Sequence, residues 1–153
     1  MESIELFSNE LVFLNKELNS SEELFDWFNV FATEKGIVTE RFLGNIKKRE
    51  AEYPTGIQTE FIGVAIPHTD PENIIKPFVA VIKPTNPILF EPMGMGEHQI
   101  KAEFIFILGV KNDGGQVVML QNLMNLLMNK EAVKLLCLAT NEEEVLKVIK
   151  NYM

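Results

Sequence analysis

The class of fold follows from one stretch of the sequence, Ala102-Glu103-Phe104-Ile105-Phe106-Ile107-Leu108-Gly109-Val110. Apart from its glutamate, the stretch is almost continuously apolar, which is typical of a central strand covered on both faces of a sheet. Shorter apolar runs over residues 61–66 and 78–82 predict two more buried strands, and residues 11–14 predict a first, short one. The chain therefore has enough strand-forming segments to build a central sheet.

Segments with helical periodicity lie on both sides of these strands in the sequence. Ser20 and Glu23 have the spacing of a capping box, apolar residues follow at helical spacing, and Gly36 is a natural stop. A glycine-rich turn at residues 112–115 leads from the longest strand into another helix. Including that one, four further helices are predicted, over residues 39–52, 117–127 and 130–136 and from residue 141 onward, where acidic residues occupy the first turn.

Strand-forming and helical segments have comparable weight along the chain. The sequence therefore predicts an α/β fold, a three-layer α/β/α sandwich with a mixed central sheet. The chain has 153 residues, of which 46% are hydrophobic and 24% charged, the composition of an ordinary globular domain. Since no repeat or flexible linker divides the sequence, we expect a single domain over residues 1–153.

Charge and cysteine content limit the possible partners and compartments. The chain has 22 acidic and 14 basic residues, a formal net charge of −8, which disfavours binding to nucleic acid or anionic lipid. Its one cysteine, Cys137, excludes an intrachain disulfide and fits a reducing compartment. The start of the chain is acidic, and no apolar run approaches the ~20 residues that a membrane span requires. These features predict a cytoplasmic protein.

The chain has two histidines, His68 and His98, and they differ in setting. His68 follows a proline directly at the end of the predicted strand 61–66, and catalytic sites of open α/β sheets gather at strand ends. A hydroxyl and a carboxylate, on Thr69 and Asp70, follow immediately. The local pattern also permits a second interpretation, in which His68 is a loop histidine bonded to a nearby carbonyl group. His98 lies in a polar stretch and is interpreted as a solvated loop histidine.

Other kinds of catalytic or binding site lack the residues they need. The histidines, cysteine and acids show no zinc-ligand spacing, and we predict neither a metal nor an organic cofactor. A Cys–His pair is disfavoured because Cys137 lies in an apolar helical run and is interpreted as a core residue. No nucleophile elbow, phosphate-binding loop or dinucleotide-binding glycine motif is present. His68 is therefore the best candidate nucleophile.

Residues 63–70, Gly-Val-Ala-Ile-Pro-His-Thr-Asp, resemble the active-site signature of the enzyme IIA domains of the fructose/mannitol/galactitol class. These domains belong to the bacterial sugar phosphotransferase system. The Ile-Pro-His core of the signature is short. The match becomes specific because further elements of the family follow and precede it in the same order over most of the chain. Its other elements are residues 49–50 (Arg-Glu), 55–56 (Thr-Gly), 78–81, 87–94, 102–110 and 123–127.

The resemblance implies a phosphocarrier that acts through a phosphohistidine. His68 would accept a phosphoryl group from the carrier protein HPr and pass it to a cysteine of the matching enzyme IIB, which works with a membrane enzyme IIC. Neutral imidazole is a good nucleophile near pH 7, and phosphoimidazole is a good donor. Because HPr and enzyme IIB must both reach His68, we expect it in a shallow, exposed depression surrounded by apolar side chains.

Two more residues take a role from the resemblance. Arg49 matches a family arginine near the site, where a guanidinium group suits phosphoryl oxygens; the alternative is an exposed surface arginine. Mannitol-type members carry a second histidine where this chain has Gln116. A glutamine amide can donate a hydrogen bond to a phosphoryl oxygen, but it carries no charge. Alternatively, Gln116 merely caps the start of its helix.

The subgroup and the biological role follow from the same resemblance. The missing second histidine argues against a mannitol-type protein, and residues 87–94, Pro-Ile-Leu-Phe-Glu-Pro-Met-Gly, look more like the galactitol type. We therefore expect a role in sugar uptake, with galactitol as the candidate sugar. A stand-alone regulatory protein of the nitrogen type is the main alternative. An unrelated structural domain with a coincidental Pro-His pair is the third.

Overall fold

The computed structural model describes residues 3–94, 96, 98–111 and 115–153. Within them, the main sheet has five strands. Their order across the sheet is β1 (Val12–Lys16), β4 (Phe78–Pro84), β7 (Phe104–Gly109), β3 (Gly63–Ala65) and β2 (Gly56–Gln58). β1 runs parallel to β4, and β3 runs parallel to β7, whereas the other neighbouring pairs are antiparallel. The predicted mixed sheet is confirmed.

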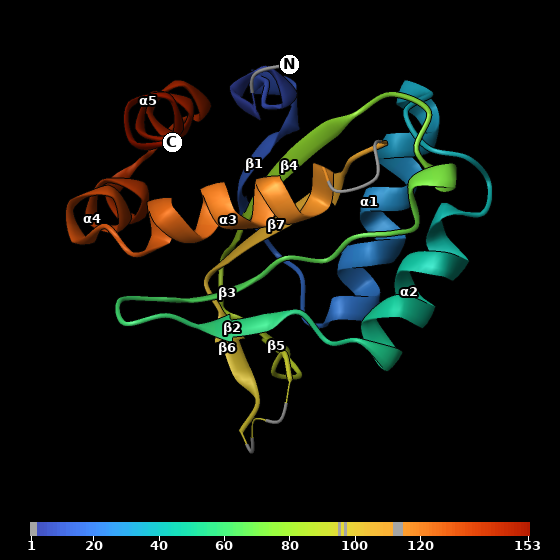
Figure 1. The fold of residues 1–153 in the computed structure, drawn as a ribbon, viewed down its shortest axis with the longest axis horizontal. Coiled ribbons are helices and arrows are strands. Elements are labelled where there is room, and N and C mark those ends of the chain that lie inside the picture. Colours follow the sequence, from blue (N-terminus) through green and yellow to red (C-terminus); the bar gives the residue numbers. More distant parts are fainter. Residues whose placement is uncertain (1–2, 95, 97, 112–114) are drawn as a thin grey trace.

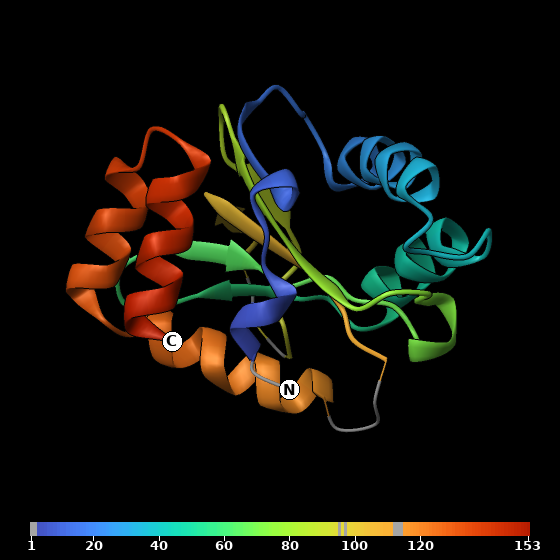
Figure 2. The same cartoon turned by 90° about the horizontal axis from the view of Figure 1, so that it is seen from above.

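Helices cover both faces of this sheet (Figures 1 and 2). One face carries α1 (Ser21–Lys35) and α2 (Phe42–Glu52). The opposite face carries α3 (Gly115–Leu127), α4 (Lys130–Leu138) and α5 (Glu142–Tyr152). Short 3-10 helices are η1 (Ser3–Leu6), η2 (Asn9–Leu11) and η3 (Pro71–Asn73). The predicted three-layer α/β/α sandwich is therefore confirmed.

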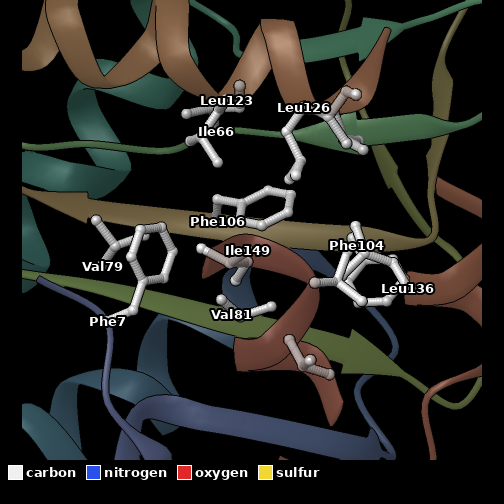
Figure 3. Packing of buried hydrophobic residues seen from close by; sticks show 14 of the residues in the cluster. Phe7, Ile66, Val79, Val81, Phe104, Phe106, Leu123, Leu126, Leu136 and Ile149 are labelled. Atoms are coloured by element: carbon white, nitrogen blue, oxygen red, sulfur yellow. The ribbon is translucent and has the colours of Figure 1, made fainter. Parts of the chain in front are cut away.

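The two central strands bury one hydrophobic core on each face of the sheet. Because successive side chains of a strand point to opposite faces, the residues of β4 and β7 divide between the two cores. Toward α3, α4 and α5 point Val79, Val81, Phe104 and Phe106, which Figure 3 labels, and Leu108, which belongs to the same cluster. Toward α1 and α2 point Phe78, Ala80, Ile82, Ile105 and Ile107. This double burial is the reason why both strands are almost continuously apolar.

The ends of α1 are set by the residues that the sequence indicates. The Ser20 side chain accepts a hydrogen bond from the Glu23 backbone N–H at 3.1 Å. The Glu23 carboxylate accepts from the N–H of Asn19, at 3.3 Å, so the return bond of the capping box reaches one residue further back than expected. Gly36 ends the helix with φ of 70°, a left-handed conformation that glycine adopts without strain.

The structure corrects the predicted strand over residues 102–110. The chain changes partner at Glu103, whose side chain is exposed and whose backbone N–H donates to the Gly63 carbonyl at 2.9 Å. Before this point, β6 (Ile100–Ala102) pairs with β5 (Ile88–Phe90) in a separate two-stranded sheet. An apolar pattern cannot reveal this break, because both segments are buried. Residues 112–114 of the predicted glycine-rich turn lie outside the described residues.

Other boundaries differ because of local hydrogen bonds and helical geometry. The strand predicted over residues 61–66 shrinks to β3, since the Thr59 hydroxyl binds the backbone of Ile62 and holds a turn there. The interpretation of Cys137 as a core residue is wrong: its side chain is exposed. The buried face of α4 consists of Ala132, Val133 and Leu136. None of the helices in the described part of the chain combines the length and apolarity of a membrane span.

Candidate functional site

His68 lies at the edge of the sheet where the parallel strands β3 and β7 have their carboxyl ends. The chain leaves β3 at Ala65, and His68 forms an isolated parallel bridge with Leu108 of β7. The Leu108 N–H donates to the carbonyl of Pro67 at 2.9 Å, which holds the segment before His68 against the sheet. β7 leaves the sheet at the same end, on the way to α3. The predicted position of His68 at a strand end is confirmed.

One ring nitrogen of His68 is bound to the backbone. Nδ1 lies 3.1 Å from the carbonyl oxygen of Ile66. Because a carbonyl can only accept, Nδ1 must carry the hydrogen, which leaves Nε2 with a free lone pair. The bond to a nearby carbonyl, which the sequence left open as an alternative interpretation, is therefore present. This bond occupies one ring nitrogen and is compatible with chemistry at the other.

The surroundings of His68 favour the neutral ring. Burial lowers the pKa of His68 most, and the positive charge of Arg49 lowers it further. The bond to the Ile66 carbonyl and the charge of Asp70 raise the pKa but do not reverse the direction. A neutral imidazole with its lone pair on Nε2 is the form that attacks an electrophile.

A small hollow opens beside the His68 ring. Its volume is about 120 Å³. It is lined by His68, Gln116 and the mainly apolar set Ile66, Met93, Leu108, Val117 and Leu120. Met93 and Val117 are 42% and 57% exposed. The sequence-based expectation of an exposed depression with apolar surroundings agrees with this geometry, although His68 itself is only partly exposed.

Arg49 reaches the site from α2, on the opposite face of the sheet from α3. Its Nη1 lies 2.9 Å from Oδ1 of Asp70, and its side chain is 31% exposed. Arg49 is thus half-buried and ion-paired, which differs from the alternative of an exposed surface arginine. Its Nε is buried and, among the described residues, has no hydrogen-bond partner. Such a donor can bind an additional acceptor that reaches it.

Gln116 connects the first turn of α3 to the segment after His68. Its Nε2 donates to the carbonyl oxygen of Thr69 at 2.9 Å, across 47 residues of sequence. The amide therefore braces the loop next to His68 instead of capping its own helix. A primary amide has two N–H donors, and this bond uses one of them.

Sequence reasoning missed a buried polar network beneath this loop. Thr69, which is fully buried, bonds through its hydroxyl to Asn45 of α2 and accepts a bond from Asn73 at 3.0 Å. Asn45 also binds Asp70. The spacing of Asn45 and Arg49, four residues apart on one helix, was a usable signal that both lie on the same face.

Glu50 was also missed as a residue that supports the site. Its carboxylate accepts from the backbone N–H of Thr55 at 2.8 Å and from the Thr55 hydroxyl at 2.7 Å. The Thr55 carbonyl in turn accepts from the N–H of Ile66 at 3.3 Å, two residues before His68. Burial raises the pKa of Glu50 to about 7, against the lowering effect of the Thr55 bonds.

The other candidate groups do not gather at this site. His98 is exposed in the segment between β5 and β6, so its interpretation as a solvated loop histidine is confirmed. Within the described residues, no group of three or more histidine, cysteine, aspartate or glutamate side chains is arranged to hold a metal ion.

Comparisons of the sequence with known proteins point to one family. The family described as "Phosphoenolpyruvate-dependent sugar phosphotransferase system, EIIA 2" matches residues 5–152. The galactitol-specific EIIA component of the phosphotransferase system of Escherichia coli strain K12 is 28% identical over 102 residues, which are 67% of each chain.

Solved structures show the same fold. Enzyme IIA of the mannitol system of Escherichia coli, solved in a complex with phosphorylated enzyme IIB, superposes with a TM-score of 0.78 and 21% identity, over 95% of this chain and 99% of that chain. Nitrogen regulatory protein IIA-Ntr from Neisseria meningitidis superposes with a TM-score of 0.75 and 21% identity, over 95% and 97%.

Proposed function

Since the chain belongs to the EIIA 2 family of the phosphoenolpyruvate-dependent sugar phosphotransferase system, we propose that it carries a phosphoryl group on His68. Family membership supports a phosphocarrier role in a sugar or polyol phosphotransferase system. The observation that carries the residue assignment is the state of the ring: Nδ1 is bound to the Ile66 carbonyl, which leaves the lone pair on Nε2, and the charge of Arg49 favours the neutral ring.

The transfer requires no cofactor in this scheme. Nε2 of His68 attacks the phosphorus of phospho-HPr, the P–N bond of the donor breaks as the new P–N bond forms, and the donor imidazole takes back its electron pair. In the second step, the cysteine thiolate of enzyme IIB attacks the same phosphorus, and Nε2 leaves with its electrons. The Nδ1 hydrogen stays on the ring, held by the Ile66 carbonyl. Phosphoryl transfer of this kind depends mainly on positioning and charge stabilisation.

Arg49 and Gln116 have separate parts in this proposal. The buried, unpartnered Nε of Arg49 is a donor suited to a phosphoryl oxygen, and the guanidinium charge stabilises the transferring group. The remaining N–H of the Gln116 amide is a candidate second donor, since Gln116 lines the same hollow as His68. Gln116 carries no charge, so Arg49 supplies the positive charge of the site.

Phospho-HPr and an enzyme IIB, coupled to a membrane enzyme IIC, are the proposed partners. The solved relative from the mannitol system forms a complex with phosphorylated enzyme IIB, which supports the choice of enzyme IIB. Galactitol is the proposed sugar, because the chain shares 28% identity with a galactitol-specific EIIA component. We propose that residues 1–153 act as one enzyme IIA-like domain. Action in the cytoplasm stays a prediction.

A labelling experiment tests the residue assignment. The chain is incubated with enzyme I, HPr and phosphoenolpyruvate that carries a labelled phosphate. We expect acid-labile label on the wild type and on His98→Ala, the matched control, and none on His68→Ala. Label that persists in His68→Ala, or a wild type that takes no label from active HPr, refutes the proposal.

A second experiment separates the transport role from the regulatory one. The labelled chain is mixed with purified enzyme IIB proteins of galactitol, mannitol and fructose type. We expect the fastest loss of label with the galactitol-type IIB. A chain that takes label on His68 but gives it to none of these proteins supports the nitrogen-type regulatory role instead.

A further inference from the structure

A single asparagine joins α2 to the segment that follows His68. Asn45 and Arg49 lie four residues apart, so their side chains project from the same face of α2. Oδ1 of Asn45 accepts from the Thr69 hydroxyl at 2.5 Å and from the Asp70 backbone N–H at 2.8 Å. Nδ2 of Asn45 donates to the Asp70 carboxylate at 2.9 Å. One side chain therefore makes three bonds to two consecutive residues.

Asn45 and Arg49 bind different oxygens of the same carboxylate. Asn45 donates to Oδ2 of Asp70, and Arg49 donates to Oδ1 at 2.9 Å. Two donors from residues one turn apart hold the plane of the Asp70 carboxylate. The Asp70 side chain is 38% exposed. An ion pair that is so open to water holds a long arginine side chain only weakly in one orientation. The bond from Asn45 supplies further support.

The other half of the amide restrains the backbone next to the nucleophile. Thr69 is fully buried, and its hydroxyl donates to Asn45 while it accepts from Asn73. Because Thr69 follows His68 directly, a fixed Thr69 limits the movement of the His68 backbone. The Asp70 N–H, bound to the same Oδ1, extends the restraint by one more residue.

We propose that Asn45 is a positioning residue for phosphoryl transfer. It orients Arg49 by way of the Asp70 carboxylate, and it fixes the backbone next to His68 by way of Thr69 and the Asp70 N–H. The inference rests on the proposed function of His68 as phospho-acceptor. The bonds of Asn45 go to Thr69 and Asp70, so it acts through these two residues. A displacement of about 1 Å at reacting groups can slow a reaction on the order of 100-fold, which makes such a residue measurable.

Asn45→Asp is the sharpest single variant, because it keeps the shape of the side chain. The new carboxylate still accepts from Thr69 and from the Asp70 N–H, but it has no donor for the Asp70 carboxylate and repels it. We expect its single-turnover rate of phosphorylation by saturating phospho-HPr to fall roughly 10- to 100-fold. The HPr concentration at half-maximal rate should change less than about threefold, since Asn45 does not line the hollow beside His68.

A reversed pair provides a rescue that a purely structural role does not predict. In Asn45→Asp/Asp70→Asn, the new amide at position 70 donates to the new carboxylate at position 45, and the anion stays one helical turn from Arg49. We expect the double variant to react faster than both Asn45→Asp and Asp70→Asn. A double variant as slow as the product of the two single effects overturns the inference.

The control is Asn29→Ala on α1, which removes an asparagine whose side chain accepts from Thr33 of its own helix at 3.5 Å. It should keep the wild-type rate. Thermal unfolding of each variant checks the fold, and Asn45→Ser replaces any variant that does not fold. An unchanged rate in Asn45→Asp, with normal labelling of the wild type, overturns this inference only. A wild type without label on His68 overturns the proposed function, and this inference with it.

Discussion

Replacing Glu50 by glutamine should change how the stability of the protein depends on pH. Glu50 lies under the site, where burial raises the pKa of its carboxyl to about 7 from an ordinary value of 4.5. A raised carboxyl pKa means that the folded state holds the proton more tightly than the unfolded state does. Between these two values, the folded state therefore binds more protons, and the free energy of unfolding must fall as pH rises.

The size of the effect follows from the same two pKa values. Each pH unit between them is worth about 1.4 kcal/mol, so ionisation of Glu50 lowers the stability by at most about 3 kcal/mol between pH 4.5 and 7. The two bonds from Thr55 lower the pKa of Glu50, and the value of about 7 already includes their effect. Glutamine keeps an acceptor for Thr55 and does not titrate, so Glu50→Gln lacks this contribution.

Urea unfolding of the wild type and of Glu50→Gln at pH 5 and pH 8 measures the effect. Fluorescence of Trp27, the one tryptophan in the sequence, follows the transition. Other carboxylates, including Glu22 and Glu91 of the hollow next to Glu50, are present in both proteins, so their effects cancel in the comparison. We expect Glu50→Gln to gain about 1–3 kcal/mol relative to the wild type from pH 5 to pH 8. Parallel pH dependences of the two proteins would refute the reasoning.

Three other predictions concern phosphoryl transfer. Arg49→Ala should slow phosphorylation by phospho-HPr on the order of 100-fold, and Arg49→Lys should recover part of the rate; equal rates in the wild type and Arg49→Ala contradict the role of Arg49. Because the pKa of His68 is lowered, the midpoint of the fall in its phosphorylation rate with decreasing pH should lie below 6.5, the ordinary value for histidine; a midpoint at or above pH 6.5 contradicts a lowered pKa. Val117→Glu, at an exposed position in the hollow, should raise the HPr concentration at half-maximal rate about tenfold without lowering the thermal midpoint, and an unchanged value excludes docking at this hollow.

Much of the fold could be predicted because its signals are local. A buried strand needs an apolar run, and an amphipathic helix needs apolar residues at a period of 3.6, so β4, β7 and α1 were readable from the sequence. The division at Glu103 was not readable, because it depends on which neighbour each half of the stretch pairs with. The short strands β2 and β5 were missed for the same reason. Cys137 was misplaced because an apolar run does not reveal which side of a helix faces the core.

The candidate site was predicted in part. His68 was singled out by elimination and by its place after a strand, and Arg49 and Gln116 were named from the family resemblance. The hydrogen bonds that Arg49 and Gln116 make in the folded protein were not predictable. Arg49 meets Asp70 across 21 residues of sequence, and Gln116 meets Thr69 across 47. Glu50 was named only as part of the Arg-Glu element, and Asn45 was not named. Neither received a role, because Asn45 meets Thr69 and Asp70 only after folding and the carboxylate of Glu50 takes its bonds from Thr55 in the turn after α2.

The sequence by itself determined the main helices, the doubly covered strands and the histidine that follows a buried strand. Each of these follows from the order of apolar, polar and chain-breaking residues within a few positions of one another. Only the tertiary structure decided that α2 supplies Arg49 and Asn45 to the same carboxylate, and that α3 braces Thr69 from the other face of the sheet. The physical reason is the short range of hydrogen bonds: contacts near 3 Å depend on how distant segments pack, and local periodicity does not encode that packing.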